Sequence, residues 1–393
     1  MTLNINQIRS ETPTCKDKLF FNSAGSSLMP TAVSQIVHEY LHKEEAFGGY
    51  YVSDNHEDIL KGFYTEAAKL LNCAPEEIAY THDATESFSR ALSSIDFKAG
   101  DCIVTSSLDY TSNQIQYLSL QKRFGIHIHR IGLTAEGNIN SNEAETLIKE
   151  HRPRLVAITH IPTNSGTVQD VKAIGEICAH YEDVYYLVDA CQSVGMIDVN
   201  VKELQCDFLS GTGRKFLRGP RGTGFLYVSD RVLQTEMSPL FVDGRSALWN
   251  EVNGYEVSPT ARRFETWEAS YAGKMGLMAA FQYANNIGIE AIQKYNNEIS
   301  QALRSRLQTI RNIEVYDRGS QLSNIITIRK KSKSLTDMEK VLSEASVFYS
   351  VSTTEWGLID FTEKGVDWVI RLSPHYFNTV EELDALCLIL DGI

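Results

Sequence analysis

The sequence predicts an α/β fold, with a large domain built on a mainly parallel sheet and a smaller α+β domain at the C-terminal end. Between about residues 65 and 230, short β-rich runs alternate with segments of helical periodicity, the order expected for a sheet with helices on its faces. Several runs are apolar on both faces, as buried parallel strands are. At 393 residues the chain also exceeds the roughly 250 to 300 residues at which a single core tends to divide.

The strands of the large sheet are expected in five β-rich runs: 102–105, 126–131, 155–159, 184–188 and 224–228. Helices are expected between them, including 113–124 and 171–181. The second of these helices follows Gln169-Asp170, and an aspartate is a good N-cap because its carboxylate accepts from free backbone N–H groups. The order strand, helix, strand therefore recurs along this part of the chain.

The smaller domain follows a long helical stretch, 274–312, which is expected to break near Ile287-Gly288. Its later elements alternate between strand and helix: strand 324–329, helix 336–345, strands 348–351 and 368–372, and a final helix from Thr379. We therefore divide the chain into three parts. Residues 1–45 form an N-terminal arm and helix that belong with the small domain, 46–273 the large domain, and 274–393 the linker helix and small C-terminal domain.

Composition and charge exclude several classes of function. The net charge of -13, from 37 basic and 50 acidic side chains, should repel a nucleic-acid backbone. The first fifteen residues lack a charged start followed by an apolar stretch, and no later run is long enough to cross a bilayer, so we expect a cytoplasmic protein without a membrane contact. The seven cysteines show no metal-ligand clustering; we expect reduced thiols and no metal site.

Lys215 and Asp189 are the first candidates for chemistry. Asp189 ends the apolar run 184–188, and the carboxyl end of a buried strand is where open α/β sheets bind ligands. Arg214 and two further arginines lie close to Lys215 in the sequence, and cationic or apolar surroundings lower the pKa of a lysine enough to provide a neutral amine. A neutral amine that condenses with an aldehyde, and a carboxylate that keeps a pyridine ring protonated, predict a pyridoxal phosphate (PLP) site.

Each residue of this pair also has an ordinary explanation. A lysine among arginines is usually part of a solvated basic loop, and Asp189 could serve as the N-cap of a following helix. The order Asp189, Gln192, Lys215 is harder to explain by capping alone, so we favour the cofactor site.

Other parts of a cofactor site follow neighbouring strands. Residues 81–92 read as a polar turn that opens a helix, and the first residues of that helix, Ala84, Thr85 and Glu86, are expected near the phosphate, although plain helix capping explains the stretch equally well. Tyr110 follows strand 102–105 and could stack on the cofactor ring, but 18 tyrosines in the chain give a single one little weight.

Polar residues after two more strands complete the candidate set. Thr163 and Asn164 follow strand 155–159 and could contact the ring hydroxyl, unless they only satisfy a turn; His160 is expected to be structural. Arg371, in strand 368–372, could bind the carboxylate of an amino acid through two parallel hydrogen bonds. An arginine that merely caps a strand end is the alternative.

Taken together, these segments resemble the class V aminotransferase family, a group of fold type I PLP enzymes that includes cysteine desulfurases, isopenicillin N epimerase and carbon-sulfur lyases. The motifs that carry the resemblance are Ala84-Thr-Glu86, Asp189-x-x-Gln192 and Gly213-Arg-Lys215. The resemblance runs from Phe20-Phe-Asn-Ser-Ala-Gly25 to the segment Arg371–Thr379, nearly the whole chain.

The resemblance implies a role for each matching residue. Lys215 would form the imine with PLP and move the α-proton, while Asp189 would hold the protonated ring nitrogen. The remaining cofactor contacts would be made by Ala84, Thr85, Glu86, Tyr110, Thr163 or Asn164, Gln192, Thr212 and Arg214. Arg371, with Ser23 and Ala24, would bind an amino acid substrate. Family members usually form homodimers, so residues 262–270 could serve the site of the neighbouring subunit.

The chain departs from the desulfurases of this family in three places. They carry a nucleophilic cysteine on a loop before the carboxylate-binding arginine, but residues 352–361 contain none, and Cys387 lies beyond the site. Tyr110 and Arg214 stand where desulfurases have histidines. Thr163 stands where desulfurases have the asparagine near the ring hydroxyl, and Asn164 is the next residue in the chain.

The runs 262–268 and 213–221 look most like the branch that holds hercynylcysteine sulfoxide lyases and isopenicillin N epimerase-like proteins. We therefore expect α,β-elimination on a cysteine-derived or cysteine sulfoxide substrate, giving pyruvate and ammonia. An epimerase or an aminotransferase would share Lys215 and Asp189 and stays open. A non-catalytic PLP-binding regulator is disfavoured because no output module is attached, and a phosphate-binding scaffold would leave Asp189 unexplained.

Overall fold

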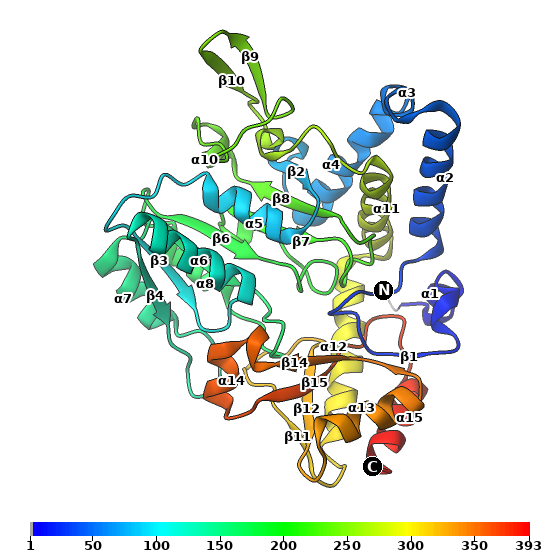
Figure 1. The fold of residues 1–393 in the computed structure, drawn as a ribbon. Coiled ribbons are helices and arrows are strands. Elements are labelled where there is room, and N and C mark those ends of the chain that lie inside the picture. Colours follow the sequence, from blue (N-terminus) through cyan, green and yellow to red (C-terminus); the bar gives the residue numbers. More distant parts are fainter. Residues whose placement is uncertain (1–2) are drawn as a thin grey trace.

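The computed structural model describes residues 3–393 and contains two main β-sheets (Figure 1). The larger sheet has seven strands in the order β2-β8-β7-β6-β5-β3-β4. Its strands are β2 (Ile78–Thr81), β3 (Cys102–Ser106), β4 (His127–Ile131), β5 (Leu155–Thr159), β6 (Tyr185–Asp189), β7 (Phe208–Thr212) and β8 (Gly224–Val228). Strands β3, β4, β5, β6 and β7 are parallel to one another, whereas β8 is antiparallel to both β7 and β2. The mainly parallel sheet is therefore confirmed.

The five predicted strands are all present, and β2 and β7 are additional. Strand β7 reads Phe-Leu-Ser-Gly-Thr, a sequence whose serine and glycine suggest a loop. Gly211 is needed here because an added Cβ would overlap the ring of Phe225 on β8. Packing across the sheet, rather than local propensity, makes this segment a strand.

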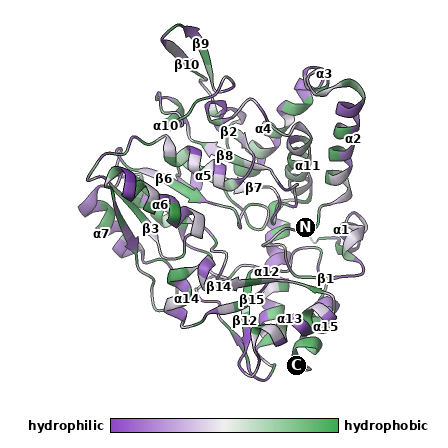
Figure 2. Ribbon diagram, in the orientation of Figure 1, coloured by the Kyte–Doolittle hydropathy of each residue, from purple (hydrophilic) through white to green (hydrophobic). Residues whose placement is uncertain are grey.

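Side chains of the large sheet alternate between two apolar layers. Val104 and Val156 belong to one buried cluster, together with residues of α7 (Ser141–His151) and α8 (Val171–Cys178). Ile103 and Leu155 point to the other face, toward α5 (Ala84–Ser93) and α6 (Thr111–Phe124). This alternation follows from the two-residue period of a strand, and Figure 2 shows the apolar strands between helices whose outer surfaces are more polar. The sheet is thus covered on both faces.

Two consecutive helices join the large and small domains (Figure 1). Helix α11 (Tyr271–Ile287) packs against α2 (Thr31–Phe47) and α4 (Glu57–Leu71), whereas α12 (Ile289–Leu307) packs against α15 (Val380–Asp391). Gly288 separates α11 from α12 with a φ of +91°, a backbone conformation that glycine adopts readily. The break expected near residue 287 is confirmed, although α12 ends at Leu307 rather than 312.

The small domain contains a four-stranded antiparallel sheet in the order β11-β12-β15-β14. Its elements are β11 (Ile313–Val315), β12 (Ile326–Lys330), α13 (Leu335–Glu344), β13 (Val347–Phe348), β14 (Ser350–Thr353), α14 (Leu358–Lys364) and β15 (Trp368–Leu372). The single strand expected at 348–351 is divided between β13 and β14, and α14 was not predicted. Strand β1 (Leu19–Phe20) pairs with β13, while the helix that follows it, α2, lies against α11.

The remaining elements are short: α1 (Ile5–Ser10), α3 (Gly49–Asn55), α9 (Val201–Leu204) and α10 (Asp230–Leu233). One more feature was not predicted. Strands β9 (Ala247–Glu251) and β10 (Gly254–Val257) form a hairpin that projects from the large domain (Figure 1). Within residues 3–393, no helix is both long enough and apolar enough to cross a membrane.

Candidate active site

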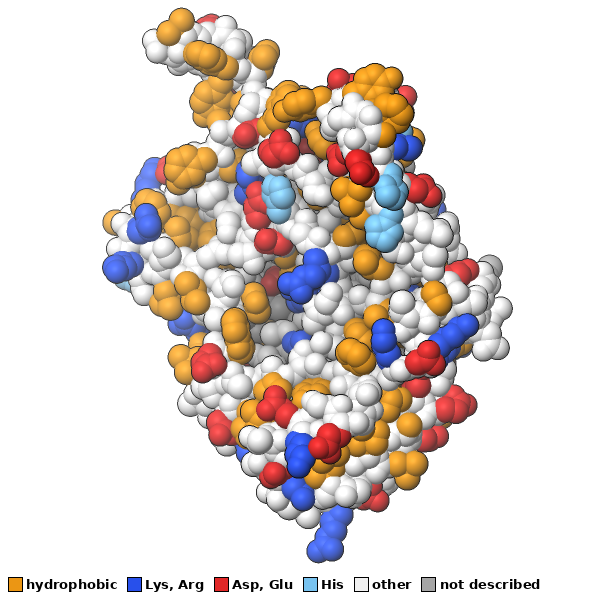
Figure 3. Space-filling view, turned by 45° about the vertical axis from the view of Figure 1, so that its right-hand side comes forward, with side chains coloured by type: hydrophobic (Ala, Val, Ile, Leu, Met, Phe, Trp, Pro, Cys, Tyr) orange, Lys and Arg blue, Asp and Glu red, His pale blue; other side chains and the backbone are white. Residues whose placement is uncertain are grey.

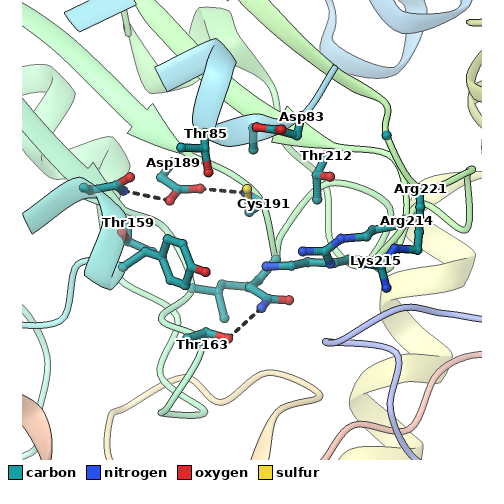
Figure 4. Close-up of a pocket in the computed structure, with 16 residues that line it drawn as sticks. Asp83, Thr85, Thr159, Thr163, Asp189, Cys191, Thr212, Arg214, Lys215 and Arg221 are labelled. Carbon is teal, nitrogen blue, oxygen red and sulfur yellow. Dashed lines mark hydrogen bonds between the residues drawn. The ribbon is translucent and has the colours of Figure 1, made fainter. Parts of the chain in front are cut away.

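The candidate site lies where the parallel strands of the large sheet end. A cavity of about 300 Å³ opens there, and Figure 4 shows side chains from the loops after several strands gathered around it. The predicted residues that line this cavity are Ala84, Thr85, Tyr110, Thr163, Asp189, Gln192, Thr212, Arg214 and Lys215. The carboxyl ends of parallel strands meet at one edge of a sheet, which explains how residues far apart in the chain come together.

A second cavity of about 190 Å³ shares several residues with the first and extends toward the small domain. Tyr110, Thr163, Arg214 and Lys215 line both cavities. The other predicted residues found at this second cavity are Ala24, Asn164 and Arg371. A ligand that fills both spaces would therefore contact the large domain at one end and the small domain at the other.

Asp189 is a buried carboxylate that faces the cavity from the end of β6. Its Oδ2 atom accepts a hydrogen bond of 3.0 Å from the side-chain amide of Asn113, and its Oδ1 atom accepts one of 3.0 Å from the backbone N–H of Cys191. Both donors fix the orientation of the carboxylate at the cavity. The sequence did not identify Asn113, which lies on the cavity side of α6 in its first turn.

A second buried carboxylate, Asp109, lies behind the first. It accepts hydrogen bonds from Tyr117 Oη at 3.0 Å and from the backbone N–H of Thr159 at 2.9 Å, and a short one from Thr105 Oγ1. Burial raises the pKa of Asp109 to about 6, and the nearby charge of Asp189 acts in the same direction. Asp109 does not line the cavity; its bonds join the ends of β3 and β5 and fix the turn that carries Tyr110.

Lys215 lies on the loop between β7 and β8. Burial lowers the pKa of Lys215 to about 8; Arg214 also lowers it, while Cys191 and Asp189 oppose the shift. An amine with this pKa is partly neutral near neutral pH, as nucleophilic attack on an aldehyde requires. The loop is held by the N-terminal arm, because the N–H of Ser27 donates to the Arg214 carbonyl at 2.8 Å and the Arg214 guanidinium donates to the Gly25 carbonyl.

Polar groups with unused hydrogen-bonding capacity face the junction of the two cavities. Gln192 donates to Thr163 Oγ1 at 3.0 Å, and Arg371 donates to the same oxygen at 2.6 Å and to Ser350 Oγ at 3.2 Å. Within residues 3–393, Gln192 Oε1 and Arg371 Nε are buried and have no partner. Buried polar atoms are normally paired, so these two atoms indicate a polar ligand. The side-chain amide of Asn164 donates to the Trp356 carbonyl at 2.7 Å, while its Oδ1 atom is likewise buried without a partner among the described residues.

Two predicted residues do not reach either cavity. The Glu86 carboxylate accepts from the backbone N–H of His82 and from Arg90 Nε, both at 2.8 Å, and its own N–H donates to the N-cap Asp83. The third residue of a helix commonly folds back in this way, so the groups left for an anion are those of Ala84 and Thr85. Ser23, on the N-terminal arm, is fully buried, and its hydroxyl accepts a hydrogen bond from Ser27 Oγ.

Cys191 is a cavity residue that the sequence analysis missed, although it lies inside the Asp189–Gln192 motif. It is the one cysteine among residues 3–393 that lines either cavity. Burial raises the pKa of the Cys191 thiol, and Asp189 raises it further, more than Lys215 and Arg214 lower it. The side chain is therefore a thiol rather than a thiolate, which makes it a poor nucleophile.

The residues of the cavity fit PLP. Four cations, Arg214, Lys215, Arg221 and Arg371, line the two spaces, a surplus of positive charge that suits a phosphate together with a substrate carboxylate. A hydrogen-bonded carboxylate suits a protonated pyridine nitrogen, and the first turn of α5 offers free N–H groups to a phosphate. Tyr110 provides an aromatic wall.

Comparison with protein families agrees with this fit. The family model described as aminotransferase class V matches residues 19–386. The chain belongs to the class V aminotransferase family. PLP is the cofactor of this family, and both the family and the fold type I architecture expected from the sequence are confirmed.

Curated relatives that match the chain are named as cysteine desulfurases. A probable cysteine desulfurase of Methanothermobacter thermautotrophicus is 30% identical over 399 residues, which cover 100% of this chain and 98% of the relative. A second, from Pyrococcus abyssi, is 26% identical and covers 98% of this chain and 96% of the relative. The chain therefore matches these proteins over their full length.

Solved structures repeat the same fold. The cysteine desulfurase of Thermococcus onnurineus in its apo form superposes with a TM-score of 0.91 at 25% identity, covering 100% of this chain and 98% of that one. The cystine C-S lyase C-DES, in complex with cysteine persulfide, superposes with a TM-score of 0.86 at 21% identity, covering 97% of this chain and 99% of that one. The second likeness concerns the fold alone.

Proposed function

We propose that this protein is a PLP-dependent lyase that cleaves the carbon-sulfur bond of a cysteine-derived or cysteine sulfoxide substrate by α,β-elimination, releasing pyruvate and ammonia. The observation that carries the proposal is the meeting of Lys215, Asp189 and Arg371 at two adjoining cavities whose outer wall, residues 352–361, contains no thiol. The names of the curated relatives support carbon-sulfur cleavage.

Each residue has a defined task in this reaction. When bound, PLP takes up the electron pair of the broken α-carbon-hydrogen bond in its protonated ring. Asp189 keeps that ring protonated, and Arg371 holds the substrate carboxylate. The neutral amine of Lys215 accepts the α-proton at Nζ. The bond between the β-carbon and sulfur then breaks, the sulfur group leaves with its electron pair, and the remaining three-carbon fragment is hydrolysed to pyruvate and ammonia.

The outer wall of the site supports elimination over sulfur transfer. Trp356 and Ser352 line the smaller cavity, and Asn164 bonds the Trp356 carbonyl. Lys364 forms a buried ion pair of 2.8 Å with Asp360 and donates to the Asn164 carbonyl at 3.1 Å. These contacts tie the wall to the cofactor cavity, and the wall itself has no thiol that could accept a sulfur atom; Cys191, which lines the cofactor cavity, is a poor nucleophile.

A product assay tests the proposal. The PLP-loaded protein is incubated with cysteine, cystine, cysteine S-conjugates and cysteine sulfoxides, and pyruvate, ammonia and alanine are measured; Lys215→Ala serves as the control. Equal amounts of pyruvate and ammonia support elimination. Alanine in place of pyruvate would instead indicate desulfuration. Conversion of an added keto acid to its amino acid would indicate transamination. Inversion of the α-carbon without either product would indicate epimerisation.

We also propose that the protein forms a homodimer through the face that carries the β9–β10 hairpin. Figure 3 shows apolar side chains on this projection, where Trp249 is 77% and Val252 is 86% exposed; nearby, Phe241 is 82% exposed. Exposed apolar clusters of this kind usually mark protein interfaces. The cytoplasmic location, the division into domains and the lack of a nucleic-acid partner stay predictions from the sequence.

A further inference from the structure

Three backbone carbonyls around Lys215 are held by hydrogen bonds. The Arg214 carbonyl accepts from the N–H of Ser27 at 2.8 Å, and the Lys215 carbonyl accepts from the N–H of Arg218 at 2.9 Å. The Phe216 carbonyl lies 2.8 Å from Nε2 of His375. Arg218 belongs to the same loop as Lys215. The other two donors lie outside this loop, on the N-terminal arm and on the stretch after β15.

His375 is fully buried and contacts several elements at once. Its ring packs edge-on against the ring of Phe216, with 5.1 Å between centroids. Its Nδ1 atom lies 3.2 Å from Oδ1 of Asn296 on α12, whose amide donates to the Met196 carbonyl at 3.1 Å. The Phe216 carbonyl and Asn296 Oδ1 can both only accept, and a neutral ring has one N–H; we assign that hydrogen to Nε2, which makes the shorter of the two contacts. Burial and the charge of Arg218 hold the pKa of His375 well below its usual range, so the ring is neutral.

The two residues after His375 contact the same loop. Arg218 is fully buried and has a φ of +64°, a conformation that is uncommon outside glycine. Its guanidinium lies 4.9 Å from the ring centroids of both Tyr376 and Phe377. It also donates to the Leu28 carbonyl at 2.8 Å and to Thr12 Oγ1 at 2.5 Å. The segment 375–377 is therefore packed along the loop that carries Lys215.

We propose that His375 is a positioning residue for Lys215: its hydrogen bond to the Phe216 carbonyl fixes the lysine-bearing backbone relative to Arg371. Arg371 lies four residues before His375 in the chain and lines the same cavity as Lys215. The inference rests on the proposed function, in which Arg371 holds the substrate carboxylate and Lys215 takes the proton from the carbon that bears this carboxylate. Such a reaction depends steeply on the distance between the two groups, and an error of about 1 Å can cost roughly a hundredfold in rate.

Two substitutions separate this role from ordinary core packing. His375→Phe keeps the ring and its edge-on contact but removes the donor, whereas His375→Gln keeps an N–H that can reach the same carbonyl. Leu342→Ala is the control for lost stability, because Leu342 is fully buried in the core of the small domain and belongs to a different cluster from Phe216. If His375→Phe does not fold, His375→Met replaces it, because methionine has a flexible side chain of similar volume and no hydrogen-bond donor.

The measurements are made on PLP-loaded protein. The pH titration of the visible absorption band reports the environment of Lys215, and steady-state kinetics give kcat and KM. We expect His375→Phe to move the titration midpoint by about half a unit or more and to lower kcat by about ten- to a hundredfold, with KM changed by less than about threefold. His375→Gln should restore most of both properties, and Leu342→Ala should lower the melting temperature without moving the midpoint.

The positioning role is refuted if His375→Phe keeps the midpoint and kcat of the original protein, or if His375→Gln is as impaired as His375→Phe. It is also refuted if Leu342→Ala moves the midpoint equally, since lost stability alone would then explain the effect. Failure of the proposed function has a different signature: the original protein would form no pyruvate from any substrate of the product assay. If the original protein forms pyruvate and His375→Phe keeps its midpoint and kcat, only the positioning role is overturned.

Discussion

The side-chain amide of Asn113 donates a hydrogen bond of 3.0 Å to the carboxylate of Asp189. This bond orients the carboxylate that would pair with a protonated pyridine nitrogen. We expect Asn113→Leu to weaken PLP binding by about ten- to a hundredfold, the range for a lost hydrogen bond to a charged group. Equilibrium dialysis of PLP measures the effect. Ser119→Ala, on the exposed side of the same helix, is the control, and an affinity unchanged in Asn113→Leu would contradict the role.

The lowered pKa of Lys215 predicts how PLP capture depends on pH. Only the neutral amine attacks the aldehyde, and burial brings its pKa to about 8. The rate at which cofactor-free protein takes up PLP should therefore be constant above pH 8 and fall by about tenfold for each unit below it. Stopped-flow absorbance at a series of pH values tests this.

Lys274 provides a matched control for that experiment. Burial lowers the pKa of Lys274 to about 8 as well, but its amine donates to Tyr64 Oη at 2.6 Å and does not line the cavities. Lys274→Met should leave the pH midpoint of PLP uptake in place. A midpoint that follows Lys274 rather than Lys215 would contradict the assignment.

Substitution of Arg371 should affect substrate binding more than cofactor binding. Arg371→Lys keeps the charge but loses the planar fork that can bind a carboxylate through two bonds. We expect KM to rise by about ten- to a hundredfold, while the spectrum of bound PLP stays the same. Arg329→Lys, on the neighbouring strand β12, where the arginine pairs with Asp367, is the control. An unchanged KM in Arg371→Lys would show that another group binds the carboxylate.

Cys191 gives a test of elimination against sulfur transfer. Because the proposed reaction does not use its thiol, Cys191→Ala should form pyruvate within about fivefold of the original rate, the range expected for a lost packing contact. Because burial keeps Cys191 a protonated thiol, iodoacetamide should label it only slowly in the cofactor-free protein and more slowly still when PLP is bound. Mass spectrometry of the labelled peptide measures this, with the partly exposed Cys387 as the internal reference. Complete loss of turnover in Cys191→Ala would point to sulfur transfer through this residue.

The apolar hairpin predicts where a dimer would be broken. A charge in the centre of an apolar interface is costly to bury, so Trp249→Asp should convert a dimer into monomers in sedimentation-velocity experiments. Leu388→Asp is a suitable control, since Leu388 is 75% exposed on α15 at the opposite end of the molecule (Figure 1). Dissociation by Leu388→Asp instead would relocate the interface.

The sequence predicted those parts of the fold that depend on local periodicity. The mostly apolar runs, such as 155–159, were found because a strand buried on both faces is recognisable by itself. Strand β7 was missed because its serine and glycine are tolerated only through the packing of Phe225 across the sheet. The β9–β10 hairpin was missed although Asn253-Gly254, a dipeptide typical of tight hairpin turns, lies at its turn; only the folded chain shows that its apolar side chains stay exposed.

The candidate site was predictable where strand ends carry unusual side chains, as at Asp189 and Lys215. Asn113 and His375 act through partners that are distant in the sequence, so their contacts can be seen only in the folded structure. Glu86 illustrates the opposite case: its position in a motif suggested a phosphate contact, but local capping geometry directs its side chain to His82 and Arg90.

The hydrogen bond from His375 to the Phe216 carbonyl has a consequence for biosynthesis. Residues of the large sheet emerge from the ribosome long before residue 375, so a nascent chain can assemble the strands around Lys215 while the lysine-bearing loop still lacks this support. We expect PLP bound by such an incomplete chain to show the displaced titration midpoint, and the midpoint of the full chain to be reached only after translation ends. Truncation of the last strand and helix should yield a product that keeps the displaced midpoint even when the large sheet has formed.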